Sequence, residues 1–223
     1  MVKLEQNELL IEITKKLSGT DPCWDKIATK FKDIPHDYRR KYNENNLASH
    51  LSETHARVSL ENICKNYQDR IVFDPIKNGQ RTENYLFEIN CELKVKRLNN
   101  GEDYTDIDEL LLIDGLPVIF EIKVGKYRYH VNSRKHPASP SSRGVAYAMN
   151  EQRIDYLIDP VKEFFGCNPG FVLVTTKDHI RKYNPTQNHF RELGGILVPL
   201  YTDRICYKKD VAWANSKYNL LES

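Results

Sequence analysis

The sequence predicts one α/β domain on a mixed sheet, with a small helical extension at its N-terminus. Three observations predict this class. Apolar and polar residues alternate with period two in the middle of the chain, which marks strands with one buried face. The run GFVLVTT, residues 170–176, is almost wholly apolar and indicates a strand covered on both sides. Helical spacing marks the segments between the strands, so we place the extension in residues 1–45 and the domain in residues 46–223.

The expected elements follow in order along the chain. Helices are expected over residues 7–17, 22–31 and 47–67, and one strand over residues 85–95. A hairpin follows at residues 105–125, then a helix from about residue 145 to 165 and the strand at 170–176. A further helix ends in FRELGG, and GILVPLY is the last strand. The predicted core is therefore a helix, a three-strand meander, a helix and a strand.

Composition limits the class of protein. The chain has 223 residues, of which 40% are hydrophobic and 29% charged, and no apolar run reaches the length of a membrane span. We expect a soluble, cytoplasmic protein without a membrane partner. The formal net charge is only +2, so binding of nucleic acid would need a local basic patch. The five cysteines form no CxxC pair, which argues against a disulfide framework and a zinc site.

The hairpin carries an unusual set of charges. Asp114 and Gly115 are favoured in a two-residue turn, and such a turn places Ile113 opposite Leu116. Counting outward then places Asp108 opposite Glu121 and Asp106 opposite Lys123, all four on one face.

Two carboxylates directly opposite one another repel, so a compensating charge is expected. A divalent cation such as Mg²⁺ would supply it, and this chemistry suits cleavage of phosphodiesters, with Lys123 orienting a water or stabilising developing charge. The alternative is a solvated hairpin end in which Asp106 and Lys123 form a surface ion pair. The cross-strand position of Asp108 and its apolar surroundings favour the site.

These residues resemble the signature of the PD-(D/E)XK nuclease superfamily, which includes Holliday-junction resolvases and RecB-like nucleases. The match lies in IDELLLIDGLPVIFEIK, on Asp108, Glu121 and Lys123. The resemblance covers about residues 47–176 and implies a restriction-endonuclease-like core. It also implies hydrolysis of DNA, less often RNA, with Mg²⁺ or Mn²⁺ held by Asp108, Glu121 and the backbone carbonyl of Ile122.

Two further elements are similar to the family pattern. Gln152 and Tyr156 have the spacing of a Q-x-x-x-Y motif and share a helix face, where they would contact a phosphate or orient the lysine. The resemblance also implies an additional catalytic side chain from the first core helix. Glu61 is the leading candidate, with Glu53 and His55 as alternatives. The chain lacks the cysteine cluster of Cas4-like enzymes.

A basic segment follows the hairpin directly. It would clamp a phosphate backbone through Lys126, Arg128, Arg134, Lys135 and Arg143, or else it is a solvated loop. The leading hypothesis is thus a Mg²⁺-dependent deoxyribonuclease acting on DNA, with branched and single-stranded forms among the candidate substrates. The alternative is a non-catalytic nucleic-acid-binding protein on the same scaffold. A homodimer would suit the cutting of two strands by paired sites.

Overall fold

The computed structural model describes residues 7–39, 47–89, 93–124, 145–180, 184–201 and 203–221. The helices are α1 (Glu8–Leu17), α2 (Trp24–Lys32), α3 (His36–Arg39), α4 (Leu47–Cys64), α5 (Val145–Ala148), α6 (Glu151–Phe165), α7 (Pro185–Glu192) and α8 (Arg204–Tyr218). The strands are β1 (Ile71–Phe73), β2 (Tyr85–Ile89), β3 (Leu93–Arg97), β4 (Asp103–Ile107), β5 (Glu109–Ile113), β6 (Leu116–Ile122), β7 (Gly170–Thr176) and β8 (Ile196–Tyr201). Short 3₁₀ turns follow α4 at Lys65–Tyr67 and β7 at Lys177–His179.

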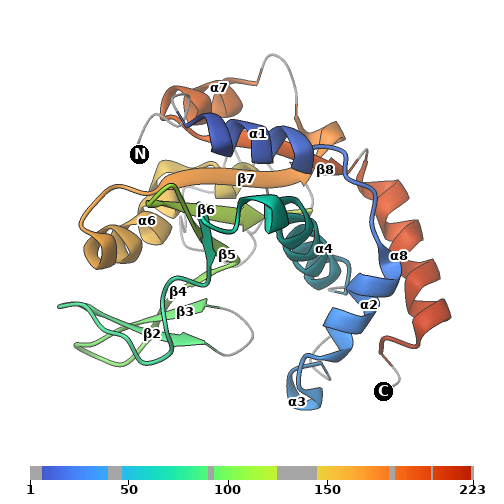
Figure 1. Ribbon diagram of the computed structural model, residues 1–223, viewed down its shortest axis with the longest axis horizontal. Coiled ribbons are helices and arrows are strands. Elements are labelled where there is room, and N and C mark those ends of the chain that lie inside the picture. The colour runs from blue at the N-terminus through green and yellow to red at the C-terminus, as the bar shows by residue number, and fades with distance from the viewer. Residues whose placement is uncertain are drawn as a thin grey trace, which may run out of the picture.

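The strands form two sheets (Figure 1). The larger has the order β1-β5-β6-β7-β8, with antiparallel pairing from β1 to β6 and parallel pairing from β6 to β8. The smaller is the antiparallel sheet β2-β3-β4, which lies below the larger one in the view. The α/β class and the mixed sheet are therefore as expected. A three-strand antiparallel arrangement is present as β1-β5-β6, but its first strand is β1 and not the predicted residues 85–95, because β2, β3 and β4 form a sheet of their own.

Helices cover both faces of the larger sheet. One face packs on α1, α2, α4 and α8, and receives Val118, Phe120 and Ile122 from β6. The opposite face packs on α5, α6 and α7 and receives Ile119 together with Phe171 of β7. Because both faces are covered, all seven residues of β7 are buried, as its apolar run predicted. No helix in the described ranges is long and apolar enough to cross a membrane.

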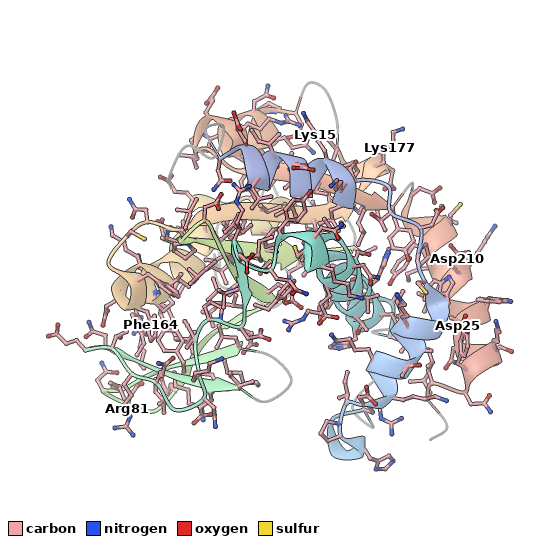
Figure 2. All side chains as sticks on the ribbon, viewed as in Figure 1. Lys15, Asp25, Arg81, Phe164, Lys177 and Asp210 are labelled. Atoms are coloured by element: carbon pink, nitrogen blue, oxygen red, sulfur yellow. The ribbon has the colours of Figure 1, made fainter. Side chains whose placement is uncertain are left out.

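The smaller sheet corrects the expectation of a single strand over residues 85–95. The chain forms the antiparallel pair β2 and β3, in which Ile89 lies opposite Leu93 and Phe87 opposite Val95. Odd-numbered residues therefore pair with odd-numbered residues, and Phe87 and Val95 are buried on the same face. The alternation of buried and exposed residues therefore continues unchanged from β2 into β3, although the chain reverses direction between them. For this reason the sequence alone predicts a single strand. Phe164 of α6 meets the ring of Phe87 at a centroid distance of 5.3 Å and joins this sheet to the rest of the molecule (Figure 2).

The helices differ from the prediction in two places. The helix expected over residues 145–165 is divided into α5 and α6, because Asn150 has an extended backbone and its side chain accepts a hydrogen bond from the Gln152 amide. The chain also continues beyond β8 into α8, which begins where Asp203 accepts a hydrogen bond from the Cys206 amide. Helix α1 and the long helix α4 form as predicted.

Candidate functional site

Asp108 lies where the chain leaves one sheet for the other. The β5–β6 ladder has Ile113 opposite Leu116, as predicted, and ends at the pair Glu109–Phe120. At the next position the chain bends, and Asp108 Oδ2 accepts a hydrogen bond of 2.7 Å from the Ile122 amide. The carboxylate thus takes the place of a ladder carbonyl. This bond satisfies a backbone donor at the end of the hairpin and fixes the carboxylate beside β6.

Glu121 is the second carboxylate of the site. Its side chain is fully buried, on the face of β6 that meets α6. Oε1 lies 3.0 Å from Lys123 Nζ and 3.4 Å from Arg153 Nη2. Oε2 is buried and has no hydrogen-bond partner within the part of the chain that the structure describes. Burial raises the pKa of Glu121, against the opposing attraction of Lys123.

Lys123 joins the two carboxylates. Its ammonium group lies 3.0 Å from Asp108 Oδ2 and 3.0 Å from Glu121 Oε1. The backbone is fixed by β7, because the Lys123 amide donates to the Val174 carbonyl at 2.9 Å and the Thr175 hydroxyl donates to the Lys123 carbonyl at 2.7 Å. Burial alone would lower the pKa of Lys123, but the attraction of Asp108 and Glu121 outweighs it and raises the pKa. Lys123 is therefore a fixed cation and does not serve as a proton acceptor near neutral pH.

Two expectations about this cluster need correction. Asp106 does not face Lys123, because β4 has left the hairpin and Asp106 pairs with Lys94 in the smaller sheet. The charge that offsets Asp108 and Glu121 is provided by side chains, Lys123 and Arg153, and the repulsion between the carboxylates does not by itself require a metal. The convergence of Asp108, Glu121 and Lys123 on one patch is confirmed.

The acidic residue of α4 nearest to this patch is Glu53. Desolvation by the surrounding protein raises its pKa to about 7, and the negative charge of Asp108 contributes, while His50 and Lys123 act against the shift. Glu61 lies two turns further along α4, where it pairs with Lys30 and Arg57. His55 is buried against the ring of Tyr201, at a centroid distance of 4.8 Å, and burial lowers its pKa to about 4. Of the three candidates on α4, the structure brings only Glu53 to the patch.

The residues of the Q-x-x-x-Y motif do not contact the patch. Gln152 is exposed, and Tyr156 is exposed with its ring against that of Tyr104 at a centroid distance of 5.1 Å. Arg153, which lies between them in the sequence, reaches the site. Its guanidinium donates to the Thr105 hydroxyl at 2.9 Å and to Glu121. The sequence carried a signal for it, since Arg153 precedes the buried Leu157 and Val161 at intervals of four residues.

The donor set fits a hard cation only in part. Mg²⁺ is commonly held by one or two carboxylates with waters and substrate phosphates, and Asp108 and Glu121, with the unpartnered Oε2, provide two. Across the described ranges, no group of three or more His, Cys, Asp or Glu side chains is arranged to hold a metal ion. The Ile122 carbonyl was the third expected ligand, and the amide of the same residue donates a hydrogen bond to Asp108.

A cavity of about 380 Å³ lies beside Asp108. It is bounded by α4, by the turn at Ile34 and Pro35, and by the smaller sheet. Its polar walls include Glu53, Arg57, Asp74, Asp108 and Glu109, and its apolar walls include Ile76, Ile89, Leu93 and Ile107. The basic segment, with Lys126, Arg128, Arg134, Lys135 and Arg143, lies outside the described residues.

Arg57 and Glu109 form a buried ion pair that sequence reasoning missed. Arg57 Nη1 lies 2.5 Å from Glu109 Oε2, and the same guanidinium binds Asp74 through two nitrogens and Glu61 through Nε. Burial raises the pKa of Glu109 to about 8, although Arg57 acts to lower it. The signal that the sequence carried is the position of Glu109 directly after Asp108, because adjacent residues of a strand point to opposite faces. It indicates a second charged side chain on the other face of the strand.

Comparisons with known proteins name no family for this chain. No family model and no curated protein matches it. Among solved structures, protein VC1899 from Vibrio cholerae is similar at 14% identity and a TM-score of 0.34, over 95% of this chain and 53% of that protein. This chain thus spans about half the length of that protein, and a likeness of this size carries no statement about fold or function.

Proposed function

We propose that the protein is a metal-dependent nuclease that hydrolyses phosphodiester bonds of DNA. The observation that carries the proposal is the placement of the Lys123 ammonium 3.0 Å from two carboxylate oxygens, on Asp108 and Glu121. One of these carboxylates keeps a buried oxygen with no partner in the described part of the chain. A buried polar atom of this kind is costly unless a ligand satisfies it.

Each side chain has a distinct task in this proposal. Asp108 and Glu121 would hold a divalent cation, which supplies neutralisation of the phosphate and a lower pKa for an attacking water. Lys123 remains charged, so it orients that water or stabilises the negative charge that develops on the phosphate oxygens. Arg153 counteracts the burial of Glu121 and favours its ionised form. The cavity beside Asp108 offers space for part of the substrate.

The test is a cleavage assay on single-stranded, duplex and branched DNA and on RNA, with Mg²⁺, Mn²⁺ or EDTA. We expect cleavage with metal, none in EDTA, and loss of at least 100-fold in rate for Lys123→Ala. Lys96→Ala is a matched control, because Lys96 forms a strand ion pair of 2.8 Å with Glu88 in the smaller sheet. Equal loss in both variants would refute the assignment of Lys123, and cleavage in EDTA would refute the metal dependence.

Two other outcomes distinguish the alternatives. Salt-dependent binding of DNA without cleavage by the wild type would indicate the non-catalytic binding protein instead. Neither binding nor cleavage would leave the cluster of Asp108, Glu121 and Lys123 as a structural ion network. Size-exclusion chromatography with light scattering on the same samples tests the proposed homodimer.

A further inference from the structure

Arg57 is held by three acidic side chains from three parts of the chain. It lies on α4 with its side chain 20% exposed, and its guanidinium binds Glu61 on the same helix, Asp74 after β1 and Glu109 at the start of β5. It also lies over the ring of Phe73, 5.1 Å from the centroid. A guanidinium held in this way has little freedom to move, because its planar fork is bound on both nitrogens and on Nε.

Glu109 is equally constrained. Its side chain is 7% exposed, and a buried carboxyl group that loses its hydrogen-bond partner is destabilised in either protonation state. The contact of 2.5 Å therefore fixes one turn of α4 against the first residue of β5.

The residues next to this pair belong to the proposed site. Glu53 precedes Arg57 by four residues and lies on the same side of α4. Asp108 directly precedes Glu109. Glu53, Asp108 and the Arg57–Glu109 pair all line the same cavity. The position of Arg57 against Glu109 therefore sets the position of Glu53 against Asp108.

We propose that the Arg57–Glu109 ion pair is a positioning device that holds Glu53 beside Asp108 and so sets the affinity of the site for a divalent cation. This inference rests on the proposed function for the cation, and assigns Arg57 and Glu109 the role of positioning Glu53.

The experiment measures Mn²⁺ affinity by electron paramagnetic resonance and stability by urea unfolding. The variants are Arg57→Lys, Glu109→Gln and the double variant Arg57→Leu with Glu109→Leu. The double variant removes both buried charges, so it should approach wild-type stability. We expect Mn²⁺ affinity to fall about tenfold in all three variants and to stay low in the double variant even where stability is restored.

Arg70→Met is the matched control. Arg70 precedes β1 and binds Asp114, in the turn after β5, through two nitrogens at 2.8 and 2.7 Å. It is therefore an Arg–Asp pair at the end of β5 remote from Asp108. Its Mn²⁺ affinity should equal that of the wild type. Wild-type affinity in the double variant would overturn the inference and leave the proposed function intact.

A metal-free measurement separates failure of the inference from failure of the proposed function. Hydrogen exchange in EDTA reports on the Ile122 amide, which donates to Asp108. If the wild type binds no Mn²⁺, the cation assignment fails, and the exchange data then decide the positioning role. Faster exchange at Ile122 in the double variant than in Arg70→Met, at equal stability, supports that role, and equal exchange refutes it.

Discussion

At the scale of single residues, one oxygen of Asp108 accepts two hydrogen bonds. Oδ2 accepts hydrogen bonds from the Ile122 amide at 2.7 Å and from Lys123 at 3.0 Å. The side chain is only 12% exposed, so both bonds form in a poorly hydrated environment. Asp108 therefore contributes to stability as well as to the proposed chemistry.

Asp108→Asn should lower the free energy of unfolding in EDTA by about 1–3 kcal/mol, because the amide can still accept from Ile122 but no longer pairs with the ammonium. Urea unfolding measures this. Asp106→Asn is the control, since Asp106 is exposed on β4, and its effect should stay within about 0.5 kcal/mol. Equal stability of Asp108→Asn and the wild type would contradict the ion pair.

Substitutions of the adjacent residues Arg153 and Gln152 should affect the rate of cleavage differently. Arg153→Gln should slow cleavage and move its rise with pH to higher pH, because Arg153 lowers the pKa of Glu121. Gln152→Ala should leave the rate within about twofold, since Gln152 is exposed and donates to the Asn150 side chain through its backbone amide, which the substitution keeps. A pH–rate profile of both variants is the measurement. The reverse result would favour the motif implied by the resemblance.

At the scale of elements, the hairpin turn sets the register that brings Asp108 beside β6. Asp114 and Gly115 have φ of 51° and 78°, the positive values that a two-residue turn of this type requires. A side chain on Gly115 would meet no neighbouring atom, so the cost of a substitution there is one of backbone conformation.

Gly115→Ala should destabilise the protein by about 1–2 kcal/mol, the cost of a side chain in the left-handed region. Cleavage per folded molecule should not change, because the turn is at the far end of the hairpin from Asp108. Thermal unfolding and the DNA assay together check this. Loss of cleavage at full stability would indicate a slipped register.

At the scale of the whole molecule, buried carboxyls should make stability depend on pH. The pKa of Glu53 is raised to about 7 and that of Glu109 to about 8, so both bind protons more tightly in the folded than in the unfolded protein. Their contribution to stability is then greatest below the ordinary pKa of about 4.5 and is lost as pH rises through 7 and 8.

Stability in EDTA should therefore fall between pH 5 and pH 8, by at most about 1.4 kcal/mol per pH unit for each carboxyl. Glu53→Gln and Glu109→Gln should each reduce this slope. Stabilisation by Mg²⁺ should instead grow with pH, because binding needs ionised carboxylates. Urea unfolding at several pH values measures both trends. A slope that neither substitution alters would assign the dependence to other groups.

Local patterns were enough for several parts of this protein. The helical spacing of α1 and α4, the doubly covered strand β7 and the register from Ile113 and Leu116 were all predictable, since each depends on residues close together in the chain. The meeting of Asp108, Glu121 and Lys123 was predictable for the same reason, because a two-residue turn fixes which positions face each other.

The tertiary structure decided what local patterns could not. In β2 and β3, odd-numbered residues pair with odd-numbered residues, so the alternation of apolar and polar residues continues through both strands and resembles that of one strand. Only the long-range pairing of β4 with β3 shows that β4, with Asp106, does not belong to the hairpin. The packing of α6 on β6 selected Arg153 over Gln152 and Tyr156, and the packing of α4 on β5 selected Glu53 over Glu61 and paired Arg57 with Glu109. A helix sequence shows which residues share a face, but which face meets the site depends on the buried area and ion pairs of the whole fold.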